Sequence, residues 1–231
     1  MTLARRALAE ALGTAFLLAI VIGSGIMGEQ LAGGNVAIAL LANTLATGAG
    51  LVVLILAFGP LSGAHFNPVV SLMEAARGGL AWGAVPAYLA AQVAGAFSGA
   101  AAAHLMFDKP LFFASQKVRD GGALMWSEFV ATFGLVFIIV CVSRSRATAI
   151  PYAVGTWITA AYWFTSSTSF ANPAVTLARA ASDTFAGIRP WDAPGFIAAQ
   201  CIGALAAVLL CRWLFAGTPG LPGSTGGTGK S

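Results

Sequence analysis

The feature that most constrains this chain is a series of long stretches without a charged side chain. They cover residues 11–28, 30–73, 78–107, 129–143, 147–178 and 193–211. A helix crosses the hydrocarbon core of a bilayer, which is ~30 Å thick, with about 20 apolar residues. Because 58% of the residues are hydrophobic and 9% are charged, we predict an integral membrane protein. A disordered chain, a disulfide scaffold and a soluble nucleic-acid binder are excluded.

Six apolar helices are predicted from these stretches, which makes the fold class an all-α membrane protein. They lie near residues 8–28, 36–58, 81–105, 122–143, 149–167 and 192–215. Two of the stretches, 30–73 and 147–178, are too long for one helix and too short for two, and the surplus of each contains an Asn-Pro pair. Irregular backbone survives at membrane depth where protein buries it or a watery cavity accepts it. The two surpluses are therefore predicted to be re-entrant segments.

Basic residues near the helix ends predict the orientation of the chain. With both termini inside, the cytoplasmic segments carry seven Lys or Arg residues and the outer segments carry five. The positive-inside rule favours that arrangement. Residues 1–216 are predicted to form a single transmembrane domain. Residues 217–231 are rich in Gly, Pro, Ser and Thr, a composition typical of a disordered tail.

An internal repeat divides the predicted domain into two halves, near residues 8–107 and 122–215. Three motifs occur in both halves in the same order: Glu10 with Thr14 and Glu128 with Thr132; Asn67-Pro-Val-Val-Ser-Leu72 and Asn172-Pro-Ala-Val-Thr-Leu177; Pro86, Gln92 and Gly95, and Pro194, Gln200 and Gly203. Because each half holds three spans, the second half must be inverted relative to the first. Inverted repeats place the working site near the membrane midplane, where discontinuous helices meet.

The two Asn-Pro pairs predict half-helices that begin inside the membrane. Asn is a favourable N-cap, and Pro at the next position lacks the N–H that would have no partner. The predicted starts are Asn67, Pro68 and Val69 in the first half, and Asn172, Pro173 and Ala174 in the second. Each helix N-terminus carries a partial charge of about +0.5. Their meeting point should therefore repel cations and donate hydrogen bonds to neutral hydroxylated solutes.

Residues 62–72 and 170–177, together with the paired Glu and Gln positions, resemble the aquaporin (major intrinsic protein) family, and the resemblance extends over roughly residues 8–215. It implies an aquaporin-like inverted repeat of six transmembrane helices plus two re-entrant half-helices. The implied function is a passive channel for small uncharged solutes, a homotetramer in the lipid bilayer with one pore per protomer. No enzymatic activity and no cofactor are expected.

Three ionisable side chains near the predicted pore allow two interpretations each. The resemblance implies that Glu10 and Glu128 accept backbone hydrogen bonds from the re-entrant loops, whereas an ionisable group in an apolar span also suggests a proton relay. His65 resembles the family's pore-lining His, and a scaffold role in the loop is the alternative. The competing class of function is an ion- or proton-coupled secondary transporter, because such transporters also use inverted repeats and broken helices.

The family's narrowest point is built from four positions, and counting from Asn67 and Asn172 without gaps places them at Thr47, Ala160, Ser169 and Val175. The family usually has Arg at the last position, and Val offers neither charge nor donors. A wide, weakly polar constriction is therefore expected. An arginine-less filter resembles bacterial aquaglyceroporin-like channels linked to metalloids. It implies a bacterial plasma membrane and solutes such as glycerol, arsenite or methylated arsenicals, with water as a further candidate.

Two further groups of residues were weighed. Arg179 lies one helical turn after Val175 and either faces the outer vestibule or is an interfacial Arg that extends its charge to the membrane surface. The cysteines Cys141, Cys201 and Cys211 lack metal-ligand spacing and are expected to be small buried side chains in the helices. No catalytic residue and no metal site are predicted.

Overall fold

The computed structural model describes residues 1–217, and within them every regular element is helical. In chain order the helices are α1 (Leu3–Leu31), α2 (Val36–Ser62), α3 (Pro68–Ala76), α4 (Val85–Met106), α5 (Gly122–Ser145), α6 (Ile150–Phe164), α7 (Pro173–Ala180) and α8 (Ala193–Leu214). Single 3-10 turns at Trp82–Ala84 and Ala147–Ala149 precede α4 and α6. From residue 218 onward, the predicted disordered tail lies outside the described residues.

Among the described helices, α1, α2, α4, α5 and α8 are long and apolar enough to cross a membrane. Helix α6 has 15 residues and is ~22 Å long at a rise of 1.5 Å per residue. It is shorter than predicted because Thr165 has extended backbone, so the chain leaves the helix before residue 167. Helix α6 packs against α2 and α5 and is the shortest of the six helices that surround the half-helices. The predicted all-α membrane fold is confirmed.

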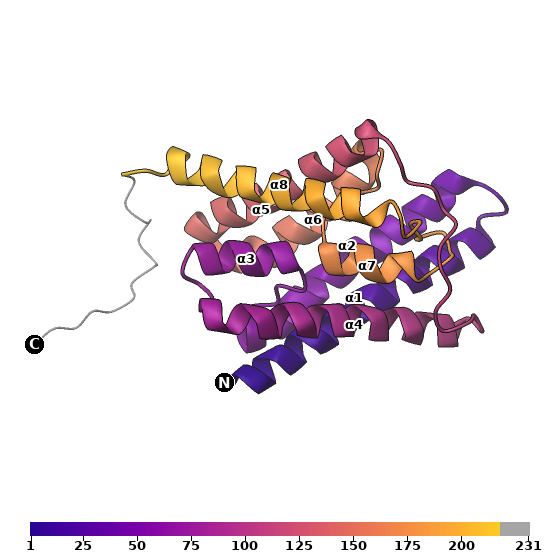
Figure 1. Ribbon diagram of the computed structural model, residues 1–231, viewed down its shortest axis with the longest axis horizontal. Coiled ribbons are helices and arrows are strands. Elements are labelled where there is room, and N and C mark those ends of the chain that lie inside the picture. The colour runs from indigo at the N-terminus through magenta and orange to yellow at the C-terminus, as the bar shows by residue number, and fades with distance from the viewer. Residues whose placement is uncertain (218–231) are drawn as a thin grey trace, which may run out of the picture.

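The two half-helices lie end to end in the middle of the bundle, surrounded by the longer helices (Figure 1). Helix α3 begins at Pro68 and has 9 residues, and α7 begins at Pro173 and has 8. In both, Asn is the N-cap and Pro occupies the first turn, where its missing N–H leaves nothing unpaired. The local sequence therefore starts each helix at the depth where the two meet.

The helices of the two halves pack in the same pairs, which explains the repeated glycines. Helix α1 packs on α2 and α4, and α5 packs on α6 and α8. A Cβ atom on Gly95 of α4 would lie 2.2 Å from the carbonyl oxygen of Ala11, and one on Gly203 of α8 would lie 2.5 Å from that of Phe129. Only a residue without a side chain allows such close backbone contact between membrane helices.

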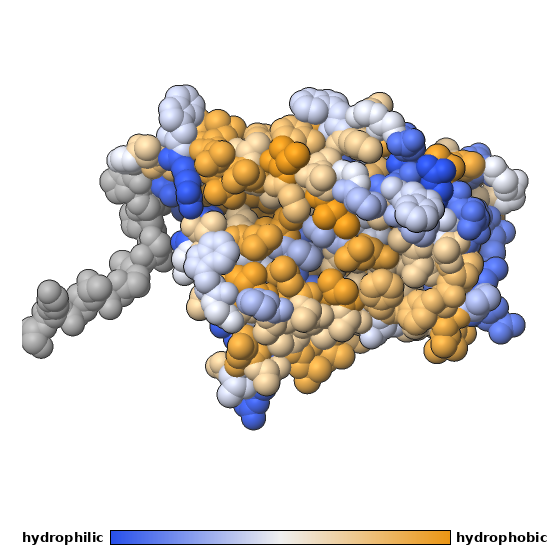
Figure 2. Space-filling model, viewed as in Figure 1, coloured by the Kyte–Doolittle hydropathy of each residue, from blue (hydrophilic) through white to orange (hydrophobic). Residues whose placement is uncertain are grey.

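The surface of the bundle is apolar along its flanks and polar at its two ends (Figure 2). Exposed apolar side chains cover the flanks, among them Phe16, Leu45, Val53, Ile202 and Leu209. The start of α1 and the end of α8 lie at one end of the molecule, which we call the terminal end (Figure 1). The opposite end carries the connections 32–35 and 107–121, and we call it the loop end. One prediction fails here: Cys201 is exposed on the flank, whereas Cys211 is buried.

Candidate functional site

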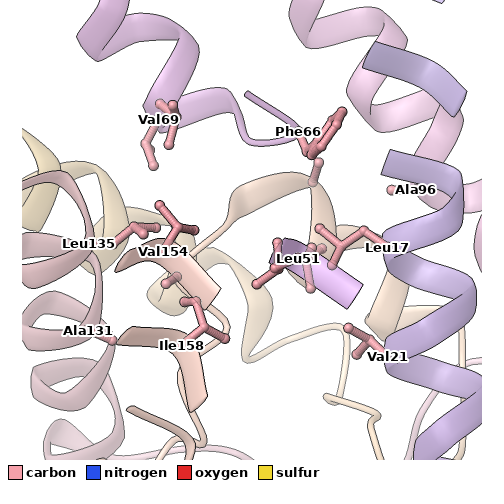
Figure 3. Packing of buried hydrophobic residues seen from close by; sticks show 14 of the residues in the cluster. Leu17, Val21, Leu51, Phe66, Val69, Ala96, Ala131, Leu135, Val154 and Ile158 are labelled. Atoms are coloured by element: carbon pink, nitrogen blue, oxygen red, sulfur yellow. The ribbon is translucent and has the colours of Figure 1, made fainter. Parts of the chain in front are cut away.

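A cavity of about 720 Å³ runs through the bundle past the point where the half-helices meet. Its walls are mostly apolar side chains from α1, α2, α5 and α6, and Figure 3 shows how several of these converge from the four helices: Leu17, Val21, Leu51, Leu135, Val154 and Ile158. The terminal end of the cavity is polar, with Arg6, Glu74 and Arg77 around its mouth. An apolar wall lets a solute pass without holding it, so polar groups at a few points must determine what enters.

The two Asn side chains cap their own helices and also hold the opposite loop. Asn67 Oδ1 accepts from the backbone N–H of Val69, and Asn172 Oδ1 accepts from those of Ala174 and Val175. Asn67 Nδ2 donates to the carbonyl of Ala171 at 2.7 Å, and Asn172 Nδ2 donates to that of Phe66, also at 2.7 Å. Each amide has two N–H donors. One N–H of each Asn is thus left for the cavity that both residues line.

Glu10 lies on α1 and is fully buried, and its carboxylate holds the first re-entrant loop. One oxygen accepts from Ser62 Oγ at 2.6 Å and from the N–H of His65 at 3.0 Å; the other accepts from the N–H of Phe66 at 2.7 Å and from Gln92 Nε2 at 2.8 Å. Gln92 Nε2 also donates to Ser71 Oγ. Both oxygens of this buried carboxylate are therefore engaged by hydrogen-bond donors of the loop and of Gln92.

Glu128 lies on α5 and repeats this arrangement in the second half. Its oxygens accept from the N–H groups of Phe170 and Ala171, both at 2.8 Å, and from Gln200 Nε2 at 2.7 Å. Gln200 Nε2 also donates to Thr176 Oγ1, the counterpart of Ser71. The structure therefore places both Glu side chains against loop backbone and away from the cavity, whose lining they do not join.

His65 lies in the first loop and lines the cavity on its terminal side. Its Nδ1 is 3.0 Å from Ser71 Oγ, and its ring is tilted against that of Tyr88 with centroids 5.2 Å apart. The backbone N–H of the same residue is bound to Glu10. Both interpretations of His65 thus apply at once, because the residue is part of the loop scaffold and its ring forms part of the wall.

Three of the four residues expected at the constriction line the loop-end half of the cavity, namely Thr47, Ser169 and Val175. The prediction for Ala160 is wrong, because that residue is exposed on the flank of α6 and absent from the cavity wall. The residues of α6 that line the cavity are Ile150, Val154, Ile158 and Tyr162. They are spaced by four, which is one helix face, and residue 160 lies on the opposite face. The constriction therefore contains an aromatic ring that gapless counting missed.

Arg179 lies in the last turn of α7 and is 2% exposed, so the alternative of an interfacial Arg extended to the surface is wrong. Its Nε donates to the carbonyl of Ala186. Its guanidinium carbon is 3.3 Å from the centre of the Phe170 ring, a cation–π contact. Arg179 and Phe170 both line the loop-end half of the cavity, together with Tyr162, whose hydroxyl is 3.4 Å from Thr47 Oγ1.

The loop end is held in place by Arg119, which the sequence analysis did not single out, and by His104 in the last turn of α4, which is fully buried. Arg119 is 8% exposed and donates from Nε to the carbonyl of Gly187 and from Nη1 to that of Ser167. His104 contacts the carbonyl of Leu111 and Ser182 Oγ through its two ring nitrogens. These contacts join residues far apart in the sequence, and no local pattern signals them.

Three basic side chains, Lys117, Arg119 and Arg179, lie close enough at the loop end to affect one another. Burial lowers the pKa of Arg119 to about 10, and burial together with the charges of Arg119 and Arg179 lowers the pKa of Lys117 to about 8. Within residues 1–217, neither Arg119 nor Arg179 forms an ion pair. Of the three, Arg179 lines the cavity, where its charge opposes the passage of cations.

No group of three or more His, Cys, Asp or Glu residues that might hold a metal ion occurs in the described part of the chain. The arrangement of the cavity is therefore chemically simple: an apolar tube with amide donors at its middle and a cationic, hydroxyl-bearing loop end.

Comparison with known proteins identifies a family with which this chain shares its sequence. The family model described as "Major intrinsic protein" matches residues 1–166 and again residues 142–228. The chain is similar to the aquaglyceroporin AqpS of Rhizobium meliloti, with 58% identity over 92% of this chain and 91% of that protein. It is 34% identical to the aquaporin NIP1-3 of Oryza sativa subsp. japonica, over 59% of this chain and 47% of the relative.

A solved structure resembles the fold over most of its length. The X-ray structure of the aquaglyceroporin from Plasmodium falciparum superposes with a TM-score of 0.70, covering 92% of this chain and 95% of that one. The two sequences are 22% identical, so this likeness concerns the fold alone.

Proposed function

This chain belongs to the major intrinsic protein family. On that premise we propose that it is a passive channel, in which small uncharged solutes cross the bilayer through the cavity past α3 and α7. The family consists of channels and not of enzymes, so no reaction is assigned to the chain. The observation that carries the proposal is the pair of reciprocal Asn contacts, which joins two helix N-termini at one point on a continuous apolar tube.

Passage at that point is limited to neutral molecules. Two N-termini facing each other add their partial positive charges, and the free N–H groups of Asn67 and Asn172 donate to an oxygen of the solute. A cation meets two repulsive dipoles and finds no carboxylate to replace its hydration shell. A hydroxylated neutral solute exchanges its bonds to water for bonds to the two amides.

The alternative of a proton-coupled transporter is not favoured. Coupling through a carboxylate requires one in the solute path, and the two membrane-embedded carboxylates lie outside the cavity lining and are engaged by loop N–H groups and glutamines. Glu74 at the terminal mouth is paired with Arg77 at 3.1 Å.

The finer features of the channel are also part of the proposal. The selectivity filter comprises Thr47, Ser169 and Val175, with Tyr162 in place of Ala160. The solutes include glycerol-like molecules and neutral metalloid hydroxides or methylated arsenicals, because Val175 is much smaller than the Arg that the family usually has there. AqpS, the relative with 58% identity, is named an aquaglyceroporin, which agrees with solutes larger than water.

The proposal further assigns a homotetramer, a single domain over residues 1–216 made of two inverted repeats, and a bacterial plasma membrane with the terminal end in the cytoplasm. The terminal end carries Arg5, Arg6, Arg77, Arg144, Arg146 and Arg212, as the positive-inside rule requires of a cytoplasmic face.

Proteoliposome swelling tests this function. The full chain is reconstituted, and the rates of shrinkage and re-swelling are recorded for water, glycerol, urea, arsenite and methylated arsenicals, against protein-free liposomes and against Asn172→Ala at equal protein content. We expect flux of the larger neutral solutes down their gradients, unaffected by a proton gradient or an uncoupler. Accumulation of any solute above its external concentration would contradict the channel.

A further inference from the structure

The loop-end half of the cavity holds a buried cation that lacks a counter-ion. Arg179 is 2% exposed, lines the cavity, and forms no ion pair within the described residues. The carbonyl of Ala186, which binds Nε, is the acceptor that the described protein provides for its guanidinium. The N–H groups of its two terminal nitrogens are therefore available to the cavity. A buried charge of this kind is costly unless it serves a ligand or a barrier.

The position of the guanidinium follows from the geometry of α7. Side chains of a helix lean toward its N-terminus and cover the preceding turn. The turn that precedes Arg179 carries Val175. The guanidinium carbon lies 3.3 Å from the centre of the ring of Phe170, which comes two positions before the N-cap Asn172. The Arg179 side chain thus extends back past the turn of Val175, toward the start of the helix.

A second unpaired group lines the same cavity as this cation. Ser169 Oγ is buried, has no hydrogen-bond partner within residues 1–217, and belongs to the cavity wall. The hydroxyl groups of Tyr162 and Thr47 complete the polar side of the wall. Unpartnered buried hydroxyls are rare in folded proteins because they forfeit their bonds to water. Two occur among the described residues, on Ser169 and Thr132, and that of Ser169 belongs to the cavity wall, where a solute oxygen can reach it.

We infer that Arg179, and not the residue at position 175, is the specificity-determining cation of the outer constriction. The inference deepens the proposed channel function and rests on it. Val175 is short enough to leave room for the Arg179 side chain, so one wall of the constriction is apolar and the adjoining wall bears guanidinium and hydroxyl groups. The filter lacks the expected Arg at position 175 but contains an arginine from the next turn.

This arrangement selects a chemical class. The solute must offer acceptor oxygens to Arg179 and Ser169 and tolerate an apolar surface at Val175, which describes small neutral molecules with hydroxyl or oxo groups on one side and methyl groups or an unhydrated face on the other. Polar groups buried without a partner reject analogues that lack the matching oxygen. A cation meets the charge of Arg179 directly.

The charges of the surrounding elements leave this barrier in place. From the connection 107–121, Arg119 contributes a second positive charge, with its guanidinium carbon 4.9 Å from the same Phe170 ring. From α5, the carboxylate of Glu128 faces the loop, where it is engaged by Phe170, Ala171 and Gln200. The positive charges of Arg179 and Arg119 therefore outnumber the single negative charge of Glu128 near the constriction.

The test relocates the guanidinium. Wild type, Arg179→Met, Arg179→Lys, and the double variant Val175→Arg with Arg179→Val are reconstituted, and proton and K⁺ leak are measured with a pH-sensitive dye beside the flux of glycerol and methylated arsenicals. Removing a unit charge a few ångströms from the path, at an effective dielectric constant of about 20, should raise the leak by roughly 100- to 1,000-fold in Arg179→Met. Arg179→Lys should leak like wild type but lose solute discrimination.

The double variant separates this inference from misfolding. It keeps one guanidinium and should exclude cations like wild type, while the long side chain at position 175 slows methylated arsenicals relative to water. If Arg179→Met conducts solutes but leaks no more than wild type, the inference is wrong. It is also wrong if Arg179→Met fails to fold and the double variant leaks. Absence of solute flux in the wild type, in contrast, would contradict the channel function itself.

Discussion

The loop that leads into α3 and the loop that leads into α7 have the same backbone and different chemistry. Ala64 and Phe66 have φ angles of 51° and 50°, and the matching residues Ser169 and Ala171 have 48° and 47°. The N–H of Ala64 donates to Ser62 Oγ at 3.1 Å, as the N–H of Ser169 does to Ser167 Oγ, also at 3.1 Å. The N–H groups of Phe66 and Ala171, the second left-handed residue of each pair, donate to Glu10 and Glu128.

The two loops differ in the side chains that bind their backbone carbonyls. The carbonyl of Ser62 accepts from the Tyr88 hydroxyl at 2.7 Å, whereas the carbonyl of Ser167 accepts from the guanidinium of Arg119 at 3.0 Å. The residue two positions before the cap is His65 in one loop and Phe170 in the other. The two loops thus pair their N–H groups alike, through a Glu on the neighbouring long helix. They differ in the groups that bind their carbonyls and in the residues that line the cavity.

The largest effect that tests this symmetry is loss of either Glu. Glu10→Ala leaves four donors without their acceptor and Glu128→Ala leaves three, at about 1–3 kcal/mol for each buried group. Both variants should lose most membrane-inserted protein, Glu10→Ala more completely, as measured by fluorescence-detected size exclusion. Normal amounts of either variant, with flux that now depends on a proton gradient, would support the transporter alternative.

Loss of one Asn amide should affect both halves equally. Asn67→Ala and Asn172→Ala each remove an N-cap, worth about 1 kcal/mol, and the bond to the opposite loop. Because the two amides act at one point, each variant should reduce the flux of every solute by a similar factor at equal protein content. A variant that slowed only large solutes would show that the half-helices act separately.

The asymmetric side is tested by Val175→Arg. The new side chain is several atoms longer than Val and adds a second guanidinium beside Arg179. Swelling assays should show a fall in the permeability of methylated arsenicals far greater than the fall for water. The inner-side control is Val70→Arg at the matching position of α3, whose effect should not follow solute size in the same way. An unchanged ratio of large-solute to water permeability in Val175→Arg would mean that residue 175 is not at the constriction.

The different anchors of the two loops predict a smaller, graded effect on stability. Tyr88→Phe removes a hydroxyl that donates to the Ser62 carbonyl and accepts from Arg6 Nε at the partly exposed terminal end, and it should cost about 1–2 kcal/mol. Arg119→Met removes the side-chain bonds to the carbonyls of Gly187 and Ser167 and should cost about 2–4 kcal/mol, because bonds from a charged donor are stronger. Thermal unfolding in detergent measures both. Equal losses of stability in the two variants would indicate that the charge of Arg119 adds nothing to the stability of the loop end.

The symmetric part of the molecule could be predicted from the sequence, and the asymmetric part could not. Motifs that occur twice, such as Asn67 and Asn172, reveal the half-helices because a local rule of capping explains each one. Tyr162 was missed because gapless counting cannot fix the rotation of α6, which ends before the loop was expected to begin. The role of Arg119 depends on contacts with residues 48 and 68 positions away, and such contacts leave no periodic trace.

The smallest expected effect concerns a left-handed position that is glycine in one loop and a β-branched residue in the other. Gly63 has a φ angle of 94°, and the matching Thr168 has one of 63°; a β-branched residue in that region is strained by about 1–3 kcal/mol. Thr168→Gly should therefore stabilise the protein by about 1 kcal/mol after the entropic cost of glycine. The reverse change, Gly63→Thr, should destabilise it, because its Cβ would lie 3.0 Å from His65 Nε2. Opposite shifts in the midpoint of thermal unfolding are expected, and shifts of the same sign would show that the two loops are not conformationally equivalent.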